Sequence, residues 1–220
     1  MRFPNAAKGL KKIFTAEILN LIGAILMVIM AGVLVGSLVA GKIGNTVSVS
    51  IMSGGLIGVG VLFIAAMVLG IIAFIMNLVG VINANHDESN FKSALIFLII
   101  SIIASVLAGV FTSNGMVSSL MRSLSTLMSL FVTIFVISGS IKLADQLNRG
   151  DVSTSGTNVL KMIIVVKVIE LIVSLIVSFM GGMVASVVAC ILFLASVILN
   201  IIQYFMYLSF LNKAKKMLNE

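Results

Sequence analysis

The sequence predicts an all-α integral membrane protein, with six transmembrane helices arranged as three hairpin repeats and both termini in the cytoplasm. Of its 220 residues, 60% are hydrophobic and only 10% are charged, whereas about a quarter of a soluble domain is charged. The apolar residues form long unbroken runs, and the basic residues gather at one set of run ends. Helices and closed β-barrels are the structures that satisfy the backbone in lipid, and long runs without alternation favour helices.

Each apolar run is long enough for the ~20 residues that cross a bilayer. The runs cover residues 13–40, 54–82, 94–112, 120–143, 159–180 and 183–210. The first is too long for the ~7–15-residue apolar core of a cleaved signal. We therefore expect residues 1–12 to form a cytoplasmic basic arm and residues 13–220 to form a single six-helix membrane domain.

Turn-forming residues occupy the gaps between the runs, at 41–45, 83–90, 113–115, 148–158 and 181–182. The last gap is two glycines, which fit either a turn or a kink. As one helix, residues 159–210 would extend about 78 Å, against a hydrocarbon core of ~30 Å. Length therefore favours a turn.

The placement of Lys and Arg predicts the orientation of the helices. In a six-helix topology one side receives Arg2, Lys8, Lys11, Lys12, Lys92, Lys142, Arg149, Lys161, Lys213, Lys215 and Lys216, and the other receives Lys42 and Arg122. Because cytoplasmic loops carry the excess of basic residues, this asymmetry places both termini inside. The expected location is the plasma (cytoplasmic, or inner) membrane, with multiple crossings.

Three similar segments suggest an internal repeat of helical hairpins, at about 11–84, 92–144 and 161–214. Their first helices align on Lys11, Lys92 and Lys161, and small or polar residues recur at four-residue steps in each. Such a stripe lies on one helix face and permits close packing in membranes. The alternative is chance alignment in a chain rich in Gly, Ala and Ser. In this register Asn20, Ser101 and Glu170 lie at one depth.

Seven polar residues fall within the predicted helices and form the candidate site: Glu17, Asn20, Asn77, Lys167, Glu170, Asn200 and Gln203. Lys167 and Glu170 lie one turn apart, and ionisable residues within a membrane are costly and mark functional sites. The repeat predicts that Glu17 faces Lys167. The cluster has two interpretations: ion pairs and hydrogen bonds that fix helix packing, or a polar cavity that binds or passes a solute.

No pattern typical of catalysis, metal binding or cofactor binding occurs, so we expect no catalytic residue, no metal and no cofactor. We expect His86, Asp87 and Glu88 to form a solvated loop, because consecutive residues do not match the spacing of metal ligands. We expect Cys190 to be a buried apolar side chain. The net charge of +7 lies at run ends rather than on a basic face, which argues against nucleic acid.

Two functional classes remain. The first is a non-enzymatic membrane subunit that acts as a scaffold or accessory partner of another membrane protein or another copy of itself, within the lipid bilayer. The alternative is a small-solute transporter or substrate-binding membrane subunit with a polar cavity on the cytoplasmic side. The Ser and Thr residues between Ser118 and Ser140 could line a path or bond back to their own helix. A wet polar layer would favour the second class.

Overall fold

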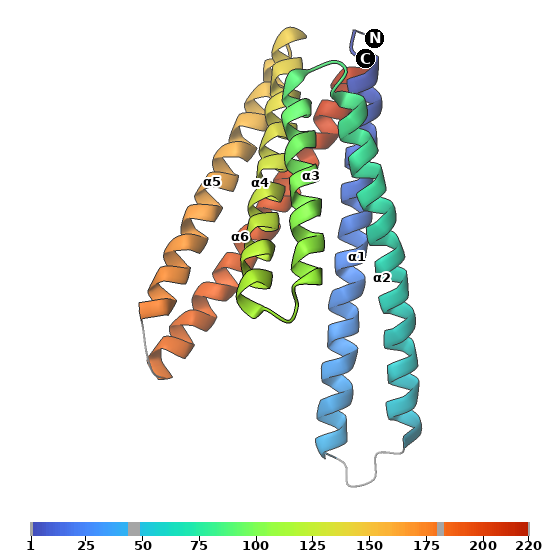
Figure 1. Ribbon diagram of the computed structural model, residues 1–220, viewed down its shortest axis with the longest axis vertical. Coiled ribbons are helices and arrows are strands. Elements are labelled where there is room, and N and C mark those ends of the chain that lie inside the picture. The colour runs from blue at the N-terminus through green and yellow to red at the C-terminus, as the bar shows by residue number, and fades with distance from the viewer. Residues whose placement is uncertain (1, 44–48, 180–182, 220) are drawn as a thin grey trace. The chain divides into compact units, whose positions relative to one another are not determined.

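The computed structural model describes the backbone of residues 2–43, 49–179 and 183–219, and the side chains of 2–36, 58–172, 192 and 194–219. The described chain forms six α-helices (Figure 1). They are α1 (Pro4–Ile43), α2 (Val49–Ala84), α3 (Ser89–Val110), α4 (Gly115–Gln146), α5 (Gly150–Phe179) and α6 (Met183–Asn219). The all-helical prediction is confirmed.

Five stretches of helix are long and apolar enough to cross a membrane: Pro4–Gly36, Gly58–Ala84, Ser89–Val110, Gly115–Gln146 and Leu194–Asn219. Large apolar side chains point outward along them; Val28 is 72% exposed and Val110 is 66% exposed. Such surfaces suit lipid rather than water, so the chain has the character of a multi-pass membrane protein. The described part of α5 carries Lys161, Lys167 and Glu170 and is not among these five stretches. Its crossing of the membrane stays a prediction.

The chain divides into two compact units, which are described separately. The first contains Met1–Leu10 and Val81–Glu220, and the second contains Lys11–Gly80. In the first unit, α4 packs against α3, α5 and α6, and α5 also packs against α6. The second unit contains the remaining parts of α1 and α2, in which Gly23 lies close enough to α2 for an added methyl group to contact Ala66 O at 3.9 Å.

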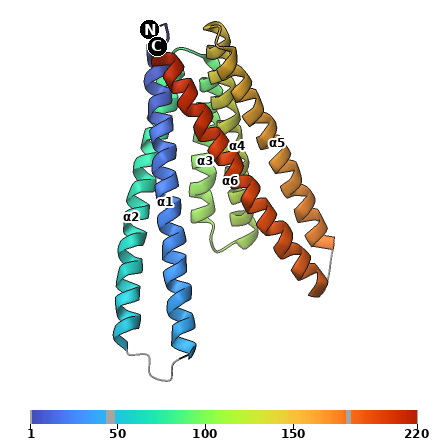
Figure 2. The same ribbon diagram turned by 180° about the vertical axis from the view of Figure 1, so that it is seen from behind.

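The first unit has a tightly packed end, here called the shared end. The starts of α1, α3 and α5 and the ends of α2, α4 and α6 meet there. The start of α1 and the end of α6 lie beside each other there in both views (Figure 1, Figure 2). Leu10, Phe91, Leu143, Phe210 and Leu211 are fully buried in it. The first unit's core therefore lies mainly at one end of its helices.

Two glycines allow aromatic rings to pack closely at the shared end. A methyl group on Gly139 would lie 2.8 Å from Cε2 of Phe91, and one on Gly156 would lie 2.8 Å from Cε2 of Phe210. Real Cβ contacts are not that short, so these positions require a residue without a side chain. Gly156 thus lets α5 approach α6 at the level of Phe210.

Two acidic residues in the loop between α2 and α3 hold the shared end together. The Asp87 carboxylate accepts hydrogen bonds from the Ala6 N–H at 2.7 Å and from Asn5 Nδ2 at 3.0 Å. Glu88, only 9% exposed, caps α3 by accepting from the Asn90 N–H and pairs with Lys142 Nζ at 3.3 Å. The expectation of a solvated loop is wrong for Glu88, because helix starts leave N–H groups that carboxylates satisfy.

The expected break at 148–158 is also too long. Helix α4 ends at Gln146, Asn148 follows with φ 55°, and the Arg149 N–H donates to Ala144 O at 2.8 Å, which is a left-handed helix stop. Helix α5 then begins at Gly150. Residues 150–158 are helical because Val152 and Gly156 begin a buried stripe, so packing overrides the low helix propensity of their polar neighbours. A hydrogen bond from Arg149 lowers the pKa of Asp151, in the first turn of α5.

The expected break at 113–115 is confirmed, since Asn114 accepts the Val117 N–H at the start of α4. Residues 41–43 of the first expected break are helical in α1, while 44, 45, 181 and 182 lie outside the described residues, as does the side chain of Cys190. Three unequal hairpins result, with α3 at 22 residues and α1 at 40. The repeat and its register stay predictions.

Hydroxyl groups and stacked rings join α3 to α4. Ser105 Oγ lies 2.6 Å from Ser125 Oγ, and Ser101 and Ser125 exchange hydrogen bonds with each other's carbonyl groups at 3.1 Å. The Phe97 ring stacks on Phe131 and Phe135, at 5.1 and 5.3 Å between centroids. Part of the small and polar stripe on α3 therefore serves close packing within its own hairpin.

Candidate functional site

Three of the seven candidate residues lie together between α5 and α6. Lys167 Nζ lies 2.7 Å from Glu170 Oε2, and Asn200 Nδ2 donates to Glu170 Oε1 at 2.6 Å. Asn200 also donates to Ser196 O on its own helix at 2.9 Å. Each oxygen of Glu170 thus has one donor, and Asn200 fixes the carboxylate from the neighbouring helix. Asn200, a residue without charge, links the ion pair to α6.

The ion pair forms one wall of a groove between α4 and α5, here called the α4–α5 groove. Its volume is about 510 Å³. It is lined by Ser123, Thr126, Leu127, Ser129, Leu130, Thr133, Lys167 and Glu170. The side chains of Lys167 and Glu170 are 40% and 32% exposed, so the pair is open to the groove rather than enclosed.

The four hydroxyl groups of the groove differ in whether their O–H donor is already used. Thr126 donates to Arg122 O at 3.0 Å and Thr133 donates to Ser129 O at 3.3 Å, so these two present only acceptor lone pairs. In the described part of the chain, the hydroxyls of Ser123 and Ser129 make no hydrogen bond. Back-bonding, expected for this helix, therefore applies to the threonines and leaves two serine donors for an occupant.

The pair lies more than two turns from either end of α5. Lys167 and Glu170 follow Gly150 by 17 and 20 residues, or about 26 and 30 Å along the helix axis. Because α5 begins earlier than the sequence indicated, the pair is near the middle of the helix. Asn200 is similarly central in Met183–Asn219.

Gln203 lies one turn beyond Asn200 on α6. Its Oε1 is buried and, among the described residues, accepts no hydrogen bond. A buried acceptor without a donor costs about 1–3 kcal/mol. Among the described residues, no hydrogen bond links Gln203 to the ion pair.

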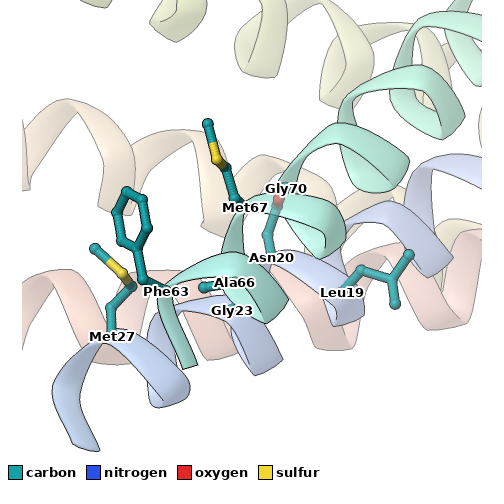
Figure 3. Close-up of a pocket in the computed structure, with 8 residues that line it drawn as sticks. All are labelled: Leu19, Asn20, Gly23, Met27, Phe63, Ala66, Met67 and Gly70. Carbon is teal, nitrogen blue, oxygen red and sulfur yellow. The ribbon is translucent and has the colours of Figure 1, made fainter. Parts of the chain in front are cut away.

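The other three candidates belong to the second unit. Asn20 is exposed and lines a groove of about 310 Å³ between α1 and α2. Figure 3 shows that the side chains around it are otherwise apolar, including Met27, Phe63 and Met67. Asn77 is half-buried, and Glu17 is half-buried and has an interaction of its own. The pairing of Glu17 with Lys167 stays a prediction.

In the described part of the chain, no three His, Cys, Asp or Glu residues gather in a way that could hold a metal ion. The sequence did not reveal the capping role of Asp87 and Glu88, and it pointed to the Ser and Thr residues between Ser118 and Ser140 without distinguishing those that line the groove. The spacing of Ser123, Thr126, Ser129 and Thr133 at three or four residues was the signal that could have identified them.

No family model, no curated protein and no solved structure matches this chain. Its function is therefore inferred from the α4–α5 groove and its surroundings.

Proposed function

We propose that this chain is a non-enzymatic multi-pass membrane protein that binds a small polar solute in the α4–α5 groove, as a transporter or as the substrate-binding subunit of one. We further propose six crossings with both termini in the cytoplasm of a plasma membrane. Five apolar helices and the basic residues near the shared end support this topology.

The observation that carries the proposal is a partly exposed ion pair beside unused hydroxyl donors in the middle of helices. Lys167 is 40% exposed, and a charged group facing hydrocarbon costs at least about 2.5–3.5 kcal/mol. Lipid is therefore a poor neighbour for this surface. Water or a polar solute would satisfy the ammonium group and the hydroxyls of Ser123 and Ser129.

The scaffold interpretation is favoured by different features. The α3–α4 seam is closed by its own hydroxyls and rings, and the described connections at 85–88, 111–114 and 147–149 are short. A protein partner would therefore be another membrane protein or another copy of this chain. This interpretation requires the groove to be dry or filled by that partner.

Aqueous accessibility distinguishes the two functions. In a Cys190→Ser background, Thr126→Cys and Ser129→Cys place thiols on the groove wall. Leu124→Cys on α4 and Val165→Cys on α5 are matched controls, because both residues are exposed and lie about 160° around their helices from Thr126 and Lys167. Thiols react as thiolates, which form only beside water.

We expect a membrane-impermeant thiol reagent to modify Thr126→Cys and Ser129→Cys at least about tenfold faster than the two controls, because thiolate formation requires hydration. Modification should be slowed when the groove is occupied. Equal protection of all four thiols in folded protein would refute a wet groove and leave the scaffold function.

A further inference from the structure

We propose that the solute of the α4–α5 groove is a small organic carboxylate with an apolar body, which replaces Glu170 as the partner of Lys167 when Glu170 takes up a proton. This inference rests on the proposed function and adds the class of solute and its coupling to protons.

The hydrogen-bonding groups of the groove favour an acceptor. Lys167 has three N–H donors, one of which is used by Glu170. The hydroxyls of Ser123 and Ser129 can also donate, and both line the groove. The negative charge in contact with Lys167 belongs to Glu170, whose two oxygens already have protein donors. An anion therefore finds unused donors beside a positive charge here.

The groove already accommodates a carboxylate beside an ammonium group, since Glu170 lies 2.7 Å from Lys167. A solute carboxylate would make the same charge-assisted contact. Leu127 and Leu130 supply apolar lining. These residues suit a short aliphatic acid better than an inorganic anion, which has no apolar part to bury.

Charge balance requires the proton. Lys167 and Glu170 together are neutral, so an added anion would leave a net negative charge within the membrane. If Glu170 Oε2 binds a proton, the carboxylate becomes a neutral acid and Lys167 is released to the solute. Asn200 continues to donate to Oε1 in both states, which holds Glu170 in place. One proton is taken up for each monovalent carboxylate bound.

In the described structure, Lys167 is the charged residue in contact with Glu170. The α4 wall contributes hydroxyls and leucines, and Arg122 is one turn before Thr126, outside the lining. The α6 side contributes Asn200, with Tyr204 one turn further and engaged in an interaction of its own.

The test measures the binding of radiolabelled butyrate to the full chain in lipid nanodiscs between pH 5.5 and 8.5. With one proton bound per butyrate, the wild-type affinity should fall about tenfold per pH unit above the pKa of Glu170. Glu170→Gln mimics the protonated acid and should bind with an affinity that does not vary with pH. Lys167→Gln should lose at least about tenfold in affinity, because the charged donor is gone. Val165→Ala should resemble wild type.

Folding of Lys167→Gln is checked by size-exclusion chromatography, and the double variant Lys167→Gln with Glu170→Gln supplies a neutral site if the single variant is unstable. Butyrate binding by that double variant as tight as by Glu170→Gln would overturn the role of Lys167. Chloride competing as well as a carboxylate would overturn the solute class.

The failure of this inference differs from the failure of the proposed function. If the groove thiols react with the aqueous reagent but no variant binds butyrate, or wild type and Glu170→Gln bind it with one pH-independent affinity, the carboxylate exchange is wrong and the wet groove stands. If the groove thiols are protected, both proposals fail.

Discussion

Replacing Lys167 with methionine should destabilise the folded protein by about 1–2 kcal/mol. Removing one member of a buried ion pair costs about 3–5 kcal/mol, whereas an exposed pair contributes about 0.2–1 kcal/mol. The exposed fractions of 40% for Lys167 and 32% for Glu170 place this pair between those limits. Asn200 still donates to Glu170 at 2.6 Å, which limits the loss.

Removing the stranded carboxylate as well should restore about 1 kcal/mol, because two apolar residues leave no uncompensated charge. The double variant Lys167→Met with Glu170→Leu should therefore be more stable than Lys167→Met. The repeat predicts instead that Glu17→Leu is the better rescuer. The 2.7 Å contact between Lys167 and Glu170 leads us to expect the larger rescue from Glu170→Leu.

The assay is reversible unfolding in mixed detergent micelles with increasing sodium dodecyl sulfate, followed by circular dichroism. Free energies are compared for the wild type, Lys167→Met and the two double variants. If neither double variant is more stable than Lys167→Met, the reasoning is refuted and Lys167 is an unpaired lysine that reaches toward the membrane surface.

Three further predictions concern the shared end and the topology. In the same assay Asp87→Ala should lose about 1–2 kcal/mol, because the start of α1 loses its cap, while Asp87→Asn keeps an acceptor and should lose less; equal stability of all three proteins would contradict the role of the 2.7 Å bond to Ala6. Asn148→Val should cost about 1–2 kcal/mol, because Asn148 has φ 55°, and Asn148→Gly should be tolerated; a tolerated valine would exclude the left-handed helix stop. Reporter fusions should read outside at Arg122 and inside at Arg149, and an inside signal at Arg122 would contradict the six-helix topology.

The helices could be predicted because lipid imposes both length and composition on a crossing segment. The start of α5 could not, because residues 150–158 carry Ser, Thr and Asn that resemble a loop. Their helical state depends on the burial of Val152 and Gly156 against other helices, with Ile141 of α4 and Phe210 of α6 beside Gly156. The hydropathy of one segment does not predict which other helices it contacts.

The candidate site was predictable in part for a related reason. The cost of intramembrane charge identified Lys167 and Glu170, and polar residues within apolar runs identified Asn200. Which hydroxyls face them depends on the rotation of α4 about its axis, which the length of an apolar run does not define. Asn20 illustrates the same limit, since the sequence did not show that it lines a groove between α1 and α2.

The packed core at the shared end and the proposed binding groove lie in different regions of the first unit. At the shared end, fully buried side chains such as Phe91 and Phe210 and the Asp87 and Glu88 carboxylates tie the helix ends together. The α4–α5 groove lies several turns away, where α4 presents hydroxyls and α5 presents a partly exposed ion pair. Close-packed regions resist deformation. A solute that exchanges with Glu170 would therefore bind several turns from the contacts that keep the helix ends aligned.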